Sequence, residues 1–163
     1  MSASEHEATR LDICRFLRVQ SKERYQSFVI YGPPLIGKTR LARQLAEIVI
    51  GSVYLDFLAY VVGHPELARR IDTLDVASVQ KIVVNYASEK GAKLLLVDEL
   101  DFLIHTWEPD LVPFKYMISS LSVTQTPTTI GFLVQTYPAL EAWHLPNTER
   151  QNRILNMETI QAL

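Results

Sequence analysis

The chain has 163 residues, of which 48% are hydrophobic and 21% charged, and its formal net charge is −2. This length allows one domain, the apolar fraction excludes a disordered chain, and the charge excludes a global basic field for nucleic acid. The single cysteine, Cys14, excludes an internal disulfide and fits a reducing compartment. Because no secretory leader or run of about 20 apolar residues is visible, we expect a cytoplasmic protein without a membrane partner.

Hydrophobic patterning predicts strands that alternate with helices in the first part of the chain. A polar start is followed by a lead-in helix expected at 4–20. Short runs of β-forming residues and apolar residues at helical spacing then predict a strand at 27–31, a helix at 38–50, a strand at 52–58, a helix at 75–90 and a strand at 93–97. Asp75 is a good N-cap for its helix, and Gly91 follows the last turn.

The same alternation continues to the end of the chain. We expect a helix at 110–122 with Asp110 as its cap, followed by a strand at 128–134, a short helix at 137–143 and a strand at 153–157. This order predicts an α/β fold in which a mainly parallel, five-stranded sheet lies between two helical layers as a three-layer sandwich. We divide the chain into a helical lead-in at 1–24 and one core domain at 25–163.

A phosphate-binding pattern lies between the first predicted strand and the next helix. Residues 32–39 read GPPLIGKT and match G-x-x-x-x-G-K-[ST], the P-loop pattern of nucleotide-binding proteins. The two glycines let the chain wrap tightly and turn amide N–H groups toward an anion at a helix N-terminus. Lys38 would reach the β- and γ-phosphates of ATP, and the Thr39 hydroxyl would ligate Mg²⁺. The expected nucleotide-binding residues are Gly32, Pro33, Pro34, Leu35, Ile36, Gly37, Lys38, Thr39 and Arg40.

Two carboxylates follow the apolar strand at 93–97 directly. Asp98 and Glu99 are typical of a Walker B element, in which the first acid secures the Mg²⁺ and the second polarises the attacking water. A strand that ends in two solvated acids has the same sequence, and the upstream P-loop pattern favours the functional interpretation. Asp101 lies close to this pair, and we interpret it as a solvated or capping residue.

The GPP start of the loop, the adjacent Asp98 and Glu99, and a polar strand end together resemble AAA-type P-loop ATPases, which belong to the additional-strand class. The resemblance implies that one more strand lies between the strands of the P-loop and the Walker B element and ends in a polar sensor. Gln135 is the candidate for that sensor, although it also reads as an ordinary strand end. Two departures are the Leu35-Ile36 pair, where small residues are common, and the lack of a helical lid after the last strand.

At this length and with these motifs, the chain also resembles the small P-loop proteins of type 3 BREX phage-exclusion systems, the BrxF family. The resemblance rests on GPPLIGKT, LLLVDELD and the RILNMETI tail. It implies a bacterial anti-phage defence component that acts with other BREX proteins on phage DNA or its modification, with the contact to DNA either indirect or unknown.

Several functions remain open at this point. The first is a Mg²⁺-dependent ATPase whose nucleotide state drives assembly or a partner's activity, with Arg150 and Arg153 as candidate arginine fingers or plain surface residues. The alternatives are a scaffold that binds nucleotide without hydrolysing it and a small-molecule kinase. Eight Lys/Arg against five Asp/Glu in residues 1–50, and five against ten in residues 51–110, fit a solvated pattern or a head-to-tail homo-oligomer.

Overall fold

The computed structural model of the protein describes residues 10–163, which contain a five-stranded sheet in the order β2-β3-β4-β1-β5. Every pairing between neighbouring strands is parallel. The strands are β1 (Phe28–Tyr31), β2 (Ser52–Asp56), β3 (Leu94–Asp98), β4 (Thr129–Val134) and β5 (Ile154–Asn156). The predicted α/β fold with a parallel five-stranded sheet is therefore confirmed.

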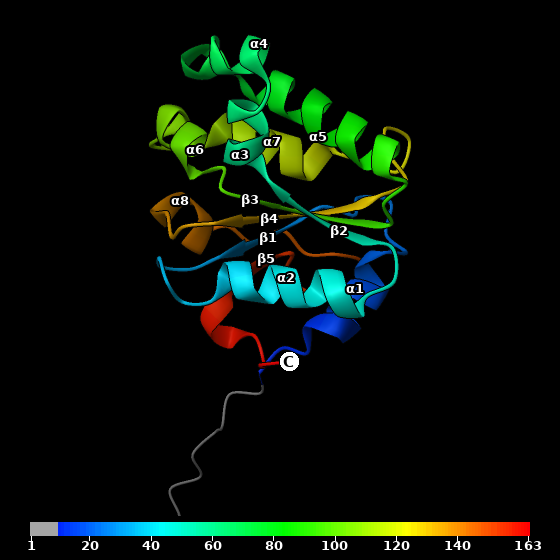
Figure 1. Cartoon of the computed structure of the whole chain (residues 1–163). Helices are drawn as coiled ribbons and strands as arrows, with labels where there is room; N and C mark the ends of the chain where they lie inside the picture. Colours follow the sequence, from blue (N-terminus) through cyan, green and yellow to red (C-terminus); the bar gives the residue numbers. More distant parts are fainter. Residues whose placement is uncertain (1–9) are drawn as a thin grey trace, which may run out of the picture.

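Helices cover both faces of the sheet, with α1 and α2 on one side and α5, α6 and α7 on the other (Figure 1). The helices are α1 (Ile13–Gln20), α2 (Lys38–Ile48), α3 (Phe57–Val62), α4 (Pro65–Ala68), α5 (Val76–Lys90), α6 (Asp101–Trp107), α7 (Val112–Ser120) and α8 (Pro138–Glu141). Two 3-10 turns, Ile71–Thr73 and Met157–Thr159, complete the elements of residues 10–163. Three layers result, as the alternating sequence pattern predicts.

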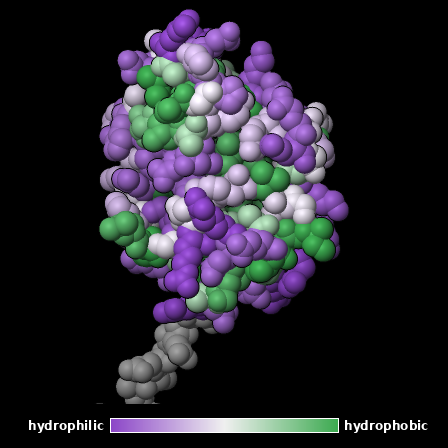
Figure 2. All heavy atoms as spheres, in the orientation of Figure 1, coloured by the Kyte–Doolittle hydropathy of each residue, from purple (hydrophilic) through white to green (hydrophobic). Residues whose placement is uncertain are grey.

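The sheet separates two apolar clusters, because successive side chains of a strand point to opposite faces. Along β3, Leu94 and Leu96 face the cluster beneath α1 and α2, while Leu95 and Val97 face the cluster beneath α5 and α7. All five residues of β3 are buried, which explains why this strand has no polar alternation. On the outside, the face shown in Figure 2 is largely hydrophilic, with hydrophobic residues in separate patches.

The lead-in helix belongs to the same core as the rest of the protein. Phe16 of α1 is buried and meets the ring of Phe28 edge to face, with 5.4 Å between the ring centroids. The helix begins at Ile13, after Asp12 as its N-cap, rather than at residue 4 as predicted, and residues 4–9 lie outside the described part of the chain. A bridge between Leu11 and Ile160 brings the two ends of the described chain together.

Strand β4 lies between β1 and β3, as the resemblance to the additional-strand class implies. Its Gly131 pairs with Phe28 of β1, and the phenyl ring occupies the space that a side chain at position 131 would need. A Cβ atom at this glycine would lie 2.2 Å from Cζ of Phe28. The close approach of backbone and ring therefore requires glycine here.

Several predicted boundaries differ from the structure. Helix α5 keeps its predicted caps, Asp75 and Gly91, but the strand predicted at 52–58 ends at Asp56, whose carboxylate caps α3. Helix α6 was not predicted, because it is only seven residues long and follows the acidic pair directly. Asp110 is wrong as a helix cap, because Leu111, with φ of 54°, precedes the first turn of α7.

No helix within residues 10–163 combines the length and the apolar character that a bilayer crossing needs.

We predict that Gly131→Ala destabilises the protein by about 2–3 kcal/mol, because the new methyl group overpacks the core against Phe28. Urea unfolding measures the change in the free energy of unfolding. Adding Phe28→Leu to this variant should recover part of the loss, because the smaller side chain makes room for the methyl group. Strictly additive effects of the two substitutions would contradict the assigned contact.

Candidate functional site

The carboxyl ends of β1, β3 and β4 open into one cleft. Its volume is about 390 Å³, and its walls combine the loop after β1, the acidic pair after β3 and the residue after β4. The lining residues are Pro34, Leu35, Gly37, Lys38, Thr39, Asp98, Glu99, Asp101 and Gln135. Segments far apart in the sequence thus meet at the edge where open α/β sheets bind their ligands.

The loop at 32–39 turns into α2 through two residues with positive φ. Gly37, with φ of 103°, is the N-cap residue of α2, and Leu35 has φ of 63° with its side chain fully exposed. Gly32 is buried, and a Cβ atom there would lie 2.9 Å from the Cβ of Met157. The pattern therefore requires glycine at its two fixed positions for different reasons. At Gly32 a side chain would collide with Met157, and at Gly37 the backbone is left-handed.

Lys38 folds back beneath the loop that precedes it. Its Nζ donates hydrogen bonds to the carbonyl oxygens of Gly32 and Pro33, at 2.6 and 2.8 Å. Desolvation lowers the pKa of this ammonium group, although Asp101 and Asp98 act in the opposite direction. The side chain is buried, and it lies at the wall of the cleft.

Asp98 is the most heavily bonded carboxylate of the cleft. Its Oδ2 accepts from the Thr39 hydroxyl at 2.6 Å and from the Tyr54 hydroxyl at 2.8 Å, and its Oδ1 accepts from the Glu99 amide at 2.9 Å. Desolvation and the bond to Asp98 raise the pKa of Tyr54, so the phenol keeps its proton and donates. Tyr54 was not predicted as a site residue, because it lies in the middle of a strand with no motif around it.

The side-chain oxygen atoms of Thr39 and Asp98 suit a magnesium ion. Thr39 and Asp98 present hard oxygen atoms, and Mg²⁺ is commonly held by one or two protein oxygens together with phosphate oxygens and water. Within residues 10–163 no group of three or more His, Cys, Asp or Glu side chains is arranged to hold a metal on its own. The residues therefore fit a metal ion that arrives with a phosphate ligand.

Glu99 follows Asp98 in an unusual backbone conformation. Its φ of 61° lies in the left-handed region, which costs a residue other than glycine about 1–2 kcal/mol. Partial desolvation raises the pKa of Glu99, and the carboxylates of Asp98, Asp56 and Asp101 raise it further while Lys38 lowers it. Backbone strain of this kind is concentrated at functional sites, and the raised pKa suits a group that accepts a proton.

Asp101 connects the segment after Glu99 to the end of β4. Its Oδ1 accepts from the Gln135 backbone N–H and from the Tyr137 hydroxyl, both at 2.8 Å. Tyr137 is buried, and desolvation together with Asp101 raises its pKa. The interpretation of Asp101 as a solvated or capping residue is corrected here, because it bridges two elements and holds the candidate sensor Gln135 by its backbone.

The two candidate arginine fingers have different surroundings. Arg153 is wrong as a finger, because only 3% of it is exposed and its guanidinium donates to the carbonyl oxygens of Tyr25 and Ile118. Arg150 is exposed, and it precedes β5, so it lies at the amino end of the parallel sheet, away from the cleft at the carboxyl end.

One of the predicted nucleotide-binding residues lies away from the cleft. Arg40 is exposed and lines a separate cavity beside Met157.

Gly32, Pro33 and Ile36 belong to the loop but are not part of the cleft lining.

No protein-family model matches the chain, and no curated protein matches its sequence.

We predict that Asp101→Ala lowers the free energy of unfolding by about 2–4 kcal/mol, because the Gln135 amide and the Tyr137 hydroxyl lose the acceptor that they share. Asp101→Asn keeps an oxygen in the same place and should lose less than half as much. Urea unfolding of both variants measures the difference. Equal losses would mean that the charge of Asp101 matters rather than its bridging position.

A second prediction concerns the pH dependence of stability. Because the fold raises the pKa of Glu99 above its unfolded value of 4.5, its ionisation costs stability as pH rises through the folded pKa. Glu99→Gln should therefore melt at a higher temperature than the natural protein at pH 7, and this difference should shrink below about pH 4.5. Glu66→Gln on α4 serves as the control. A melting temperature at pH 7 that is lower than that of the natural protein would contradict the crowding of acids around Glu99.

Proposed function

We propose that this protein binds ATP with Mg²⁺ in the cleft and hydrolyses the bond between its β- and γ-phosphates. The observation that carries the proposal is the contact between the Thr39 hydroxyl and the Asp98 carboxylate, 2.6 Å apart although 59 residues separate them in the sequence. Lys38 and Glu99 line the same cleft. A cation, a metal-binding pair of oxygens and a spare carboxylate in one cleft are the parts that phosphoryl transfer to water needs.

The phosphate chain would lie across the start of α2. Pro33 and Pro34 have no amide hydrogen, so the donors come from Ile36 onward, where free N–H groups and the helix dipole attract an anion. Lys38 already has its ammonium group within reach of the loop carbonyls. On nucleotide binding, Lys38 would exchange these carbonyl partners for β- and γ-phosphate oxygens.

Thr39 and Asp98 are the residues that would hold the metal ion. Bound there with the nucleotide, Mg²⁺ would neutralise part of the phosphate charge. Glu99 would accept a proton from the attacking water, which the raised pKa of its carboxyl group favours. Gln135 lines the same cleft, where its amide would contact the γ-phosphate or orient the water. The products are ADP and inorganic phosphate.

A second candidate function is a scaffold that binds ATP without hydrolysing it on its own. The burial of Arg153 favours this alternative, because it leaves Arg150 as the remaining candidate finger. Arg150 precedes β5 and therefore lies at the amino end of the parallel sheet, whereas the cleft of the same chain lies at the carboxyl end. Arg150 would reach a cleft only in a neighbouring copy or be replaced by a partner's arginine. We therefore propose that turnover depends on a homo-oligomer or on another protein of the same system.

The motifs also resemble those of a bacterial anti-phage defence system. We propose that this protein takes part in a nucleotide-dependent assembly step of BREX-type defence, and that its ATPase activity depends on partner proteins. In that setting DNA would be handled by the partner proteins and only indirectly by this chain.

The test compares two site variants with a control. Glu99→Gln should bind ATP and Mg²⁺ with near-normal affinity but release phosphate at least about 100-fold more slowly, because the attacking water loses its base. Lys38→Ala should weaken ATP binding about 10- to 100-fold, because the phosphates lose a charged donor. Calorimetry and a phosphate-release assay measure these effects, and Lys81→Ala on α5 is the matched lysine control.

Unchanged ATP affinity in Lys38→Ala would contradict the proposed binding site. Near-normal turnover in Glu99→Gln would remove Glu99 from its role. If the natural protein retains ATP intact, at any protein concentration, the scaffold function is favoured over the ATPase.

A further inference from the structure

A tyrosine on the edge strand of the sheet forms a hydrogen bond with one of the acids that line the cleft. Tyr54 belongs to β2 and donates its hydroxyl hydrogen to Oδ2 of Asp98, the oxygen that also accepts from Thr39. The phenol is half-buried and packs against the apolar cluster beneath α2. The proposed hydrolysis does not use this residue, and the P-loop and Walker B patterns do not include it.

The sheet register explains why the hydroxyl meets this carboxylate. Tyr54 pairs with Leu96 of β3, and Asp98 lies two residues further along β3 on the same face. Such diagonal neighbours are within the reach of a long aromatic side chain. The contact is therefore built into the parallel pairing of two strands rather than into a mobile loop.

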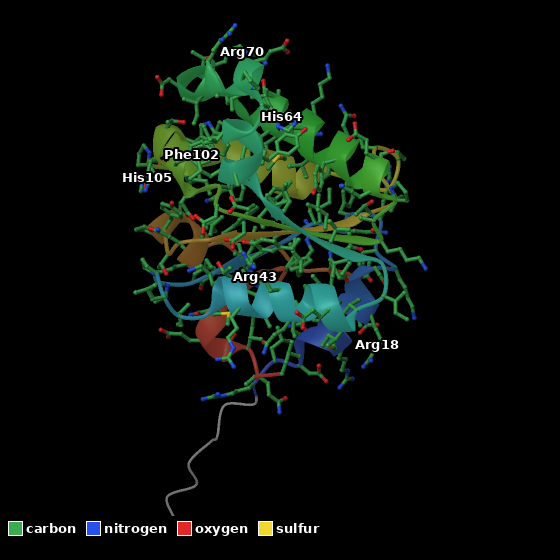
Figure 3. The ribbon with its side chains drawn as sticks, in the orientation of Figure 1. Arg18, Arg43, His64, Arg70, Phe102 and His105 are labelled. Carbon is green, nitrogen blue, oxygen red and sulfur yellow. The ribbon has the colours of Figure 1, made fainter. Side chains whose placement is uncertain are left out.

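Helix α2 closes the arrangement from its other side. Thr39 and Arg43 lie one helical turn apart, so their side chains share a face of α2. Thr39 contacts Asp98, while the Arg43 guanidinium lies 5.0 Å from the ring centroid of Tyr54. Figure 3 labels Arg43 on this helix. The cation covers the tyrosine ring, and the four side chains form a cluster that we call the Tyr54 cluster: Thr39, Arg43, Tyr54 and Asp98.

We infer that Tyr54 is a positioning residue that holds Oδ2 of Asp98 in place when the Thr39 hydroxyl turns toward a metal-bound nucleotide; this inference rests on the proposed function. Of the two side-chain donors to this oxygen, the Thr39 hydroxyl is the one expected to leave. The Glu99 amide would still fix Oδ1, and the Tyr54 hydroxyl would fix Oδ2. Both oxygens of the carboxylate would thus stay oriented by donors outside the nucleotide.

The alternative is that Tyr54 only fills space between α2 and β2. A packing role depends on the ring, whereas a positioning role depends on the hydroxyl. Tyr54→Phe separates them, because it removes one oxygen atom and keeps the ring beneath Arg43. Tyr86→Phe on α5 is the matched control, since that half-buried tyrosine packs against Tyr60 away from the cleft lining.

The measurement is the affinity for a non-hydrolysable ATP analogue, in EDTA and again in excess Mg²⁺, by calorimetry. The ratio of the two dissociation constants is the gain in affinity due to magnesium. We expect Tyr54→Phe to reduce this gain about five- to tenfold, as the loss of one hydrogen bond to a charged group would, while binding in EDTA changes less than about twofold. Tyr86→Phe should retain the full gain.

Arg43→Ala provides the second variant, because it uncovers the ring but leaves the Tyr54 hydroxyl on Asp98. It should reduce the magnesium gain by no more than about twofold. A loss as large as that of Tyr54→Phe would overturn the inference in favour of packing between α2 and β2.

The remaining outcomes separate the two proposals. If the natural protein gains affinity from magnesium and Tyr54→Phe gains as much, the positioning role is overturned and the proposed function stands. Equal weakening in EDTA and in Mg²⁺ also overturns the positioning role, because it indicates general distortion. If the natural protein does not bind the analogue at all, the proposed function fails, and the inference fails with it.

Discussion

The parallel pairing of β1, β4 and β3 is the constraint on which the cleft depends. In a parallel sheet every carboxyl end lies at the same edge, so the loop after β1, the acids after β3 and the residue after β4 must meet there. Gly131 permits this arrangement, because the ring of Phe28 takes the space of its missing side chain. A change that shifted β4 by one residue would move Gln135 away from the bond that Asp101 accepts from its backbone.

Within this frame, charge is concentrated at one edge and held by specific hydrogen bonds. Asp98 accepts three hydrogen bonds through both of its oxygens, and Asp101 accepts two through Oδ1, so protein donors orient both carboxylates. Glu99 differs, because its side chain is exposed and its backbone is strained. Hydrogen bonds hold Asp98 and Asp101 in place, whereas the Glu99 side chain is exposed. This contrast is expected where binding and proton transfer are carried out by different residues. It also means that Asp98 and Asp101 are oriented before any ligand enters.

The sequence predicts the sheet, the longest helix and the two motifs, because these depend on local patterns: apolar runs, capping residues and fixed glycines. It misses α6, which is too short for a period to be recognised, and it misplaces the start of α7, because Asp110 resembles a cap that Leu111 replaces. The roles of Tyr54, Asp101 and Arg153 depend on long-range neighbours. Tyr54 meets an acid 44 residues away, and the Arg153 guanidinium bonds to the carbonyl of Tyr25, so no local pattern distinguishes either from an ordinary strand residue or a surface arginine.

The central claim is that the cleft seats the phosphates of ATP between Lys38 and the acids after β3. A crystal structure of the protein grown with a non-hydrolysable ATP analogue and Mg²⁺ tests it most directly. We predict that Nζ of Lys38 leaves the carbonyl oxygens of Gly32 and Pro33 and bonds to β- and γ-phosphate oxygens, with a metal ion between Thr39 and Asp98. An analogue bound elsewhere, while Lys38 stays on those carbonyl oxygens, would contradict the account.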